Sequence, residues 1–136
     1  MDELDDVDHL EMVTPYGDPS DKITIGTIQN NQIAFLPRHG QGHRLLPSEV
    51  PYAANIYALK ALGVNQIISI SAVGSLREEI HPQHVVIPDQ LIDRTSNRQN
   101  TFFGNGVAVH VSFSDPYCDK PVSYTHLRAH ETEADL

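Results

Sequence analysis

A helix pattern followed at once by an apolar run limits what this chain can fold into more than any other feature. The stretch PSEVPYAANIYALKALGV, residues 47–64, has helical spacing, with Ser48 as a candidate N-cap and Gly63 as a candidate C-terminal stop. The side chains expected on its buried face recur at helical intervals: Tyr52, Ile56, Leu59 and Leu62. The pattern predicts one helix with a single apolar face.

The apolar run that follows, NQIISISAVG at residues 65–74, predicts a strand buried on both faces. Ile67, Ile68 and Ile70 stand close together with little polar alternation, which is typical of a parallel sheet. Further apolar runs occupy residues 84–92 and 106–113. A helix joined by a short turn to a buried strand is the unit of an α/β domain, so α/β is the predicted fold class.

A hairpin is expected ahead of the helix. Residues 14–21, TPYGDPSD, are rich in turn formers, and ITIGTIQNNQIAFLP follows at residues 23–37. The pair Asn30–Asn31 tolerates the positive φ of a tight turn, and the second strand is predicted at residues 32–36.

The second strand delivers the chain to PRHGQGHR, residues 37–44, which we call the basic loop. Arg38 presents a rigid fork of donors that suits phosphate or carboxylate. His39 can donate a hydrogen bond and change its charge near neutral pH. Gly40 and Gly42 allow backbone N–H groups to approach an anion. These residues are compatible both with a solvated turn and with an anion site.

A second candidate loop, SAVGSLREE at residues 71–79, lies at the carboxyl end of the predicted buried strand, where open α/β sheets bind ligands. Ser71 offers a hydroxyl and Ala72 a backbone N–H, while Gly74 and Ser75 suit a tight turn. Such neutral donors suit an oxyanion, although an ordinary turn has the same composition. Two anion-suited loops that both follow strands favour the anion site.

The remaining histidines do not make a convincing metal site. His39 and His43, and likewise His81 and His84, have spacings that can bring two imidazoles to one metal ion. However, the first pair lies in a loop that contains glycines, and no nearby carboxylate completes a ligand set. We therefore expect no metal.

Two other features have ordinary interpretations. His110 interrupts an apolar run and suits a core, an interface or a pocket wall. Arg94 and Arg98 are explained by a solvated loop.

The acidic balance argues against general nucleic-acid binding. The 136 residues include 18 acidic and 9 basic side chains, for a formal net charge of −9, whereas nucleic-acid binding requires a basic face. The acids gather in residues 1–11, expected to be a solvated, frayed terminus. Cys118 is the only cysteine, and neither a leader nor a membrane span is evident. A single-domain cytoplasmic protein is expected.

Three stretches carry a family resemblance in order along the chain: FLPRHGQGHRLLPSEVPYAANIYALKALGV, SAVGSLREEIHPQHVVIPDQLIDRT and HVSFSDPYC. Over residues 13–118 the sequence resembles the methylthioadenosine phosphorylases, in the trimeric branch of the purine nucleoside phosphorylase family. The resemblance implies a partial phosphorylase/hydrolase-like α/β fold, with a mixed, mostly β sheet flanked by helices.

The resemblance also implies phosphorolysis, in which inorganic phosphate attacks C1′ of a nucleoside and the purine leaves. For S-methyl-5′-thioadenosine the products are adenine and 5-methylthioribose 1-phosphate. Arg38, His39, Ser71 and Ala72 would bind phosphate, although related members often carry Thr or Asn in place of Ser71. His110 would face the 5′ substituent in a neighbouring subunit of a homotrimer. No cofactor is implied, since phosphate is a co-substrate.

Two parts of the family pattern have no counterpart in this sequence: a first strand with a GGTG-type loop, and a second half with purine-reading aspartates and a Met–Thr pair. Residues 1–122 are therefore interpreted as part of a nucleoside phosphorylase domain. Residues 123–136 lack a clear period, look more like a junction than native sequence and are assigned no role. The chain alone is expected to be inactive.

Alternatives stay open at this point. The stretch LPRHGQ also resembles the loop of histidine phosphatases and phosphoglycerate mutases, in which His39 would form phosphohistidine. Within the phosphorylase family, methylthioinosine or ordinary purine nucleosides are other possible substrates. A non-catalytic fragment or binding module is the third alternative.

Overall fold

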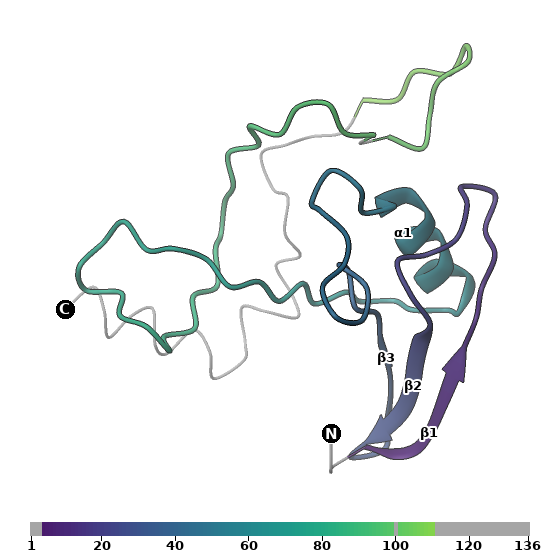
Figure 1. The fold of residues 1–136 in the computed structure, drawn as a ribbon, viewed down its shortest axis with the longest axis horizontal. Helices are drawn as coiled ribbons and strands as arrows, with labels where there is room; N and C mark the ends of the chain where they lie inside the picture. The colour runs from purple at the N-terminus through teal and green to yellow at the C-terminus, as the bar shows by residue number, and fades with distance from the viewer. Residues whose placement is uncertain (1–3, 100, 111–136) are drawn as a thin grey trace. The chain divides into compact units, whose positions relative to one another are not determined.

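The structure, a computed structural model, describes residues 4–99 and 101–110. In chain order these residues form strands β1 (Asp5–Leu10), β2 (Ile23–Ile28) and β3 (Asn31–Phe35), and helix α1 (Tyr52–Ala61). The strands make one antiparallel sheet in the order β1-β2-β3, with β2 in the middle (Figure 1). A sheet combined with a helix agrees with the predicted α/β class.

The hairpin of β2 and β3 confirms the sequence prediction, with a shift of one residue. Ile28 pairs with Asn31, and the two residues between them, Gln29 and Asn30, have φ of 49° and 66°. Positive φ at both central positions gives a turn whose twist matches that of the flanking strands. Asn31 is therefore the first residue of β3 and not part of the turn.

Strand β1 corrects the expectation of a frayed acidic terminus. Asp8 pairs with Ile25 and Leu10 with Ile23, and the register shifts between Asp5 and Asp8. The acidic side chains are exposed, as predicted. The backbone is nevertheless ordered as an edge strand, because ladder hydrogen bonds to β2 do not depend on apolar side chains.

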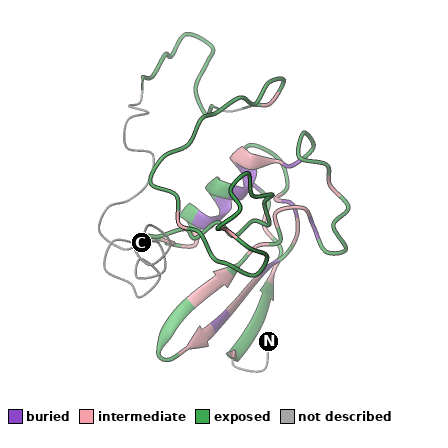
Figure 2. Cartoon of the chain, turned by 90° about the vertical axis from the view of Figure 1, so that its left-hand side faces the viewer, coloured by how far each residue is buried: buried purple, intermediate pink, exposed green. Residues whose placement is uncertain are grey.

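A small core joins α1 to the sheet. Ile23 of β2 and Ala58 of α1 are fully buried, and Leu59 is almost so. Figure 2 shows buried positions on α1 and β2, and mostly exposed positions along the chain after the helix. The basic loop lies between β3 and α1, so both of its ends are attached to elements that share this core.

Helix α1 is shorter than predicted at its N-terminal end. Pro51 occupies the N-cap position, and Ser48 does not cap the helix. Residues 46–50 form a separate turn, in which Glu49 N–H donates to Leu46 O and the Leu46 N–H donates to Glu49 Oε2. A residue that precedes proline disfavours helical dihedrals, so the helix begins only after Pro51.

The C-terminal end of α1 confirms the predicted stop. Gly63 has φ of 81°, and its N–H donates to Lys60 O, while the Val64 N–H donates to Leu59 O. This double hydrogen bond is a Schellman motif, which favours glycine because of the positive φ.

The buried face of α1 differs from the prediction. The buried residues are Ala54, Asn55, Ala58 and Leu59. Leu59 was predicted correctly, but Ile56 is exposed, and Tyr52 and Leu62 are only half-buried. Apolar side chains occur on more than one face of this helix, so their spacing alone did not identify the buried face.

The predicted buried strand after α1 is wrong for the described residues. Residues 65–71 have no strand, and Ile68 and Ile70 are 86% and 88% exposed. A strand requires a neighbour with which to exchange hydrogen bonds, and no described residue supplies one. Residues 84–92 and the described residues 106–110 also lack strands. Cys118 and residues 123–136 lie outside the described residues.

The described residues fall into two units. The first contains residues 4–68, 95–99 and 101–107, and the second contains residues 69–94 and 108–110. In the part of the chain that the structure describes, no helix combines the length and apolar character needed to cross a bilayer.

Candidate functional site

The basic loop is folded into consecutive turns by its own backbone. The Gly40 N–H donates to Pro37 O at 2.8 Å, and the His43 N–H donates to Gly40 O at 3.0 Å. Just beyond the loop, the Leu45 N–H donates to His39 O at 3.0 Å. Gly40 and Gly42 have φ of 72° and 76°, which explains the two glycines, and His43 also has positive φ at 56°. The loop is therefore a defined turn structure.

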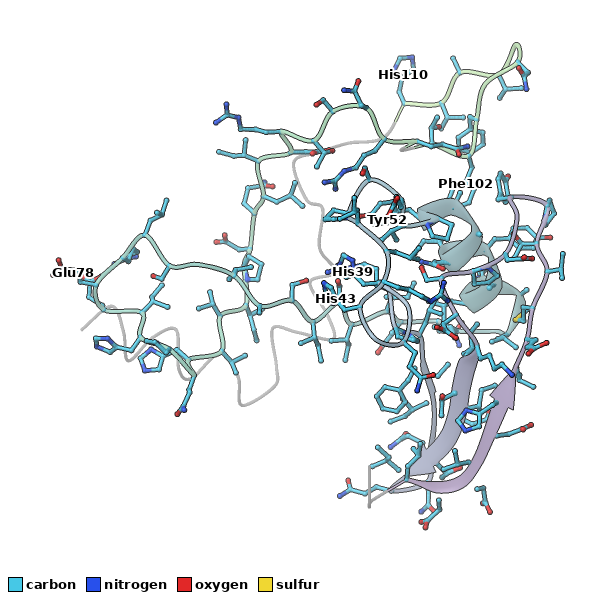
Figure 3. All side chains as sticks on the ribbon, in the orientation of Figure 1. His39, His43, Tyr52, Glu78, Phe102 and His110 are labelled. Atoms are coloured by element: carbon cyan, nitrogen blue, oxygen red, sulfur yellow. The ribbon has the colours of Figure 1, made fainter. Side chains whose placement is uncertain are left out.

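His39 is held by two contacts. Its Nδ1 lies 2.9 Å from the backbone oxygen of Leu45. Because a carbonyl oxygen only accepts, Nδ1 carries the proton, and Nε2 is left for another partner. The rings of His39 and His43 stack with centroids 4.4 Å apart (Figure 3). The imidazole therefore has a fixed orientation and one ring nitrogen available for a ligand.

The two arginines of the basic loop have different environments. Arg44 Nη2 donates to Ser20 O at 2.9 Å and to Asp21 Oδ2 at 3.1 Å. These bonds commit the Arg44 guanidinium to the segment that precedes β2. Arg38 is half-buried and adjoins His39. Arg44 is therefore engaged by the protein itself, and the phosphate role of Arg38 stays a prediction.

Asp21 is a part of this region that the sequence analysis missed. Its Oδ2 accepts from the Gln41 N–H at 2.8 Å as well as from Arg44, and its Oδ1 accepts from the Lys22 N–H at 2.9 Å. The N–H bonds from Gln41 and Lys22, followed by Arg44, lower the pKa of Asp21 to about 2. Nothing in the spacing of the sequence indicated that Asp21 would meet a loop 20 residues away.

Ser71 and Ala72 lie in the second unit, in a segment without regular secondary structure, and both are exposed. Arg38 and His39 lie in the first unit. The predicted convergence of these two pairs on one phosphate therefore stays a prediction. His110 is also exposed and belongs to the second unit, and its assignment to the 5′ substituent stays a prediction as well.

The second histidine pair also lies in the second unit. The rings of His81 and His84 are 5.4 Å apart and edge to face, and the His81 N–H donates to Nδ1 of His84. Across residues 4–99 and 101–110, no three His, Cys, Asp or Glu side chains gather as a metal ion would require.

A cavity of about 230 Å³ lies at the start of α1 in the first unit. It is lined by Tyr16, residues 48–54, Arg98 and Gln99. Arg98 was expected in a solvated loop, but it is half-buried and lines this cavity.

Comparison with known proteins decides the family. Residues 2–135, nearly the whole chain, match the phosphorylase superfamily. The chain belongs to the phosphorylase superfamily. This membership confirms the family resemblance and the partial phosphorylase fold, and it argues against membership in the histidine phosphatase family.

Several relatives of this chain share one name. The chain is similar to the S-methyl-5′-thioadenosine phosphorylase of Geobacter sulfurreducens, with 60% identity over 100% of the chain and 48% of the relative. It is also 54% identical to that of Gloeobacter violaceus, over 95% of the chain and 42% of the relative. The chain thus spans about half the length of the curated relatives it matches.

Solved structures give the same result. A methylthioadenosine phosphorylase from an Antarctic soil metagenomic library is 58% identical, with a TM-score of 0.84 over 87% of this chain and 41% of that one. The Schistosoma mansoni methylthioadenosine phosphorylase, solved in complex with adenine, is 38% identical, with a TM-score of 0.78 over 82% and 42% of the two chains. These structural similarities confirm the predicted phosphorylase fold.

Proposed function

We propose that this chain supplies part of an enzyme that phosphorolyses S-methyl-5′-thioadenosine to adenine and 5-methylthioribose 1-phosphate. The observation that carries the proposal is the 60% identity to a protein named for this activity, over the full length of the chain. The basic loop supports it, because a half-buried Arg38 and an oriented His39 are suited to holding a phosphate dianion.

In the proposed reaction an oxygen of phosphate forms a bond to C1′ while the bond from C1′ to the purine breaks, and the electron pair leaves with the base. The proton that HPO₄²⁻ gives up ends on the base, so that neutral adenine is released. Arg38 and His39 hold the phosphate, together with the Ser71 hydroxyl and the Ala72 N–H. Positioning and charge stabilisation supply most of the rate enhancement in such a reaction. His110 contacts the 5′ substituent of a nucleoside bound to a neighbouring subunit.

The surroundings of the reaction are also part of the proposal. The enzyme is a cytoplasmic homotrimer of purine and methionine salvage that uses no cofactor beyond its co-substrate phosphate. A single cysteine in the chain is consistent with a reducing compartment. The preference for methylthioadenosine over methylthioinosine or ordinary purine nucleosides rests on the names of the relatives.

The 136-residue chain by itself is proposed to be inactive. Its relatives are about twice as long, and large apolar side chains such as Ile70, Val73 and Leu76 are more than four-fifths exposed. Apolar surfaces of this kind are normally buried against other parts of a complete domain or against a partner.

A chimera tests the function directly. The matching segment of the Geobacter sulfurreducens protein is replaced by this chain, and adenine release from methylthioadenosine is measured with and without phosphate. We expect phosphate-dependent release by the chimera, a large loss in Arg38→Ala and His39→Ala, and no release by the chain alone. Release that does not require phosphate would contradict phosphorolysis, and turnover by the isolated chain would contradict its proposed inactivity.

A further inference from the structure

Two groups of the segment before β2, the Asp21 carboxylate and the Ser20 carbonyl, accept hydrogen bonds from the basic loop. Asp21 Oδ2 accepts from the backbone of Gln41 at 2.8 Å and from the side chain of Arg44 at 3.1 Å, so one oxygen contacts the loop at two positions. These positions flank Gly42 and His43, and they follow directly on the turn that contains His39. The Asp21 side chain is only 18% exposed, which limits competition from water.

Asp21 is itself held in place by its neighbours. Its Oδ1 accepts from the Lys22 N–H, immediately before β2 begins at Ile23. On the other side, Ser20 is tied to α1: its N–H donates to Asn55 Oδ1, and Asn55 Nδ2 donates to its Oγ, both at 2.8 Å. Ser20 and Asn55 are buried. The carboxylate therefore connects the basic loop to both the sheet and the helix.

Gly40 adds a steric constraint to this attachment. A Cβ at position 40 would lie 2.9 Å from Arg44 Nε, so the guanidinium packs closely on the loop backbone. Arg44 is consequently fixed between Gly40 on one side and the pair Ser20 and Asp21 on the other. Its role in this arrangement is structural.

We propose that Asp21 is a positioning residue for phosphate binding: through Gln41 and Arg44 it sets the conformation in which the basic loop presents Arg38 and His39. The inference rests on the proposed phosphate site and adds to it a residue that does not itself contact phosphate. Removing the carboxylate frees the Gln41 N–H and leaves Arg44 with its hydrogen bond to Ser20 O, so the loop gains conformations that must be given up on binding.

The test uses the complete 136-residue chain with inorganic phosphate as ligand. Phosphate affinity is measured by calorimetry, and exchange of the Gln41 amide proton by NMR, in wild type, Asp21→Asn and Arg44→Met. We expect both variants to weaken phosphate binding by about tenfold. In Asp21→Asn, exchange of the Gln41 amide proton should also become faster. Asp21→Asn keeps the shape of the side chain, and Asp21→Glu, which restores the charge, is expected to recover part of the affinity.

Two controls separate positioning from general destabilisation. Glu11→Gln removes the same charge from an exposed ion pair with Lys22 and should leave phosphate affinity unchanged. Leu59→Ala opens the core without touching the loop, and it should lower the thermal midpoint more than it changes phosphate affinity. If Leu59→Ala and Asp21→Asn lose the same stability and also weaken phosphate binding equally, the proposal is overturned.

The outcomes also distinguish this inference from the proposed function. If wild type binds no phosphate, the proposed phosphate site fails in this chain. Amide exchange then decides whether Asp21 sets the conformation of the basic loop. Fast Gln41 exchange only in Asp21→Asn supports that role, and unchanged exchange overturns it. If wild type binds phosphate and Asp21→Asn binds it equally well, the site stands and the positioning role is wrong.

Discussion

The imidazole rings of His39 and His43 stack 4.4 Å apart with an angle of 21° between their planes. The contact supports the ring whose Nδ1 is held by the backbone oxygen of Leu45. His43 was not among the residues predicted to bind phosphate, and the structure gives it a different task, which is to limit rotation of His39.

Replacing His43 should therefore weaken phosphate binding indirectly. His43→Asn removes the ring but tolerates the positive φ at this position, and we expect about a fivefold loss of phosphate affinity from the lost ring pair. His43→Phe retains an aromatic surface and should lose less. Calorimetric titration with phosphate measures both, and a larger loss in His43→Phe than in His43→Asn would contradict the stacking role.

Gly40 and Gly42 provide a matched pair of substitutions. Both have positive φ, but a Cβ at Gly40 meets the Arg44 guanidinium, whereas a Cβ at Gly42 meets nothing within 4 Å. Gly42→Ala should cost about 1–2 kcal/mol of unfolding free energy from backbone strain alone. Gly40→Ala should cost more, because Arg44 must move as well. Urea unfolding at neutral pH gives both values, and equal costs would mean that the guanidinium adapts freely.

Asn55 is predicted to be essential for stability. Its side chain pairs with both the N–H and the hydroxyl of Ser20 inside the protein. Asn55→Ala leaves these two groups buried without their partner, and since each such group costs about 1–3 kcal/mol, a loss of about 2–6 kcal/mol is expected. Lys60→Ala, on the exposed side of the same helix, should change stability by less than about 0.5 kcal/mol. Chemical unfolding of the two variants compares them directly.

Asp21 should make stability depend on pH in the acid range. Its pKa is about 2 in the folded chain, against an ordinary value of 3.8. A lowered carboxyl pKa means that its contribution is complete above the ordinary value and disappears as the pH falls through about 2. The difference in unfolding free energy between wild type and Asp21→Asn should therefore shrink over this range. Urea titrations at several acid pH values measure it, and a difference that does not change with pH would contradict this assignment.

Local sequence signals were sufficient wherever a structure depended on neighbouring residues. The hairpin followed from two apolar runs around an Asn-containing turn, and the helix stop followed from Gly63. In each case the preferred dihedrals of one or two residues fix the backbone, and no distant contact is required.

Signals of burial were less successful. Ile68 and Ile70 suggested a buried strand. Apolar character makes burial favourable, but it does not supply the neighbouring strand that a sheet requires. The acidic N-terminal residues suggested a frayed terminus, but residues 5–10 form strand β1, which pairs with β2. The face of α1 was also mispredicted, since Ala58 and Asn55 face the core while Ile56 does not.

The sequence by itself determined the family, the turns, and the presence of Arg38 and His39 on one glycine-containing loop, because these depend on residue identity and local dihedral preference. Only the tertiary structure decided that Asp21 holds this loop and that Asn55 anchors Ser20. Such contacts join residues with no fixed spacing, and they exist only when β2, the loop and α1 pack around a shared core.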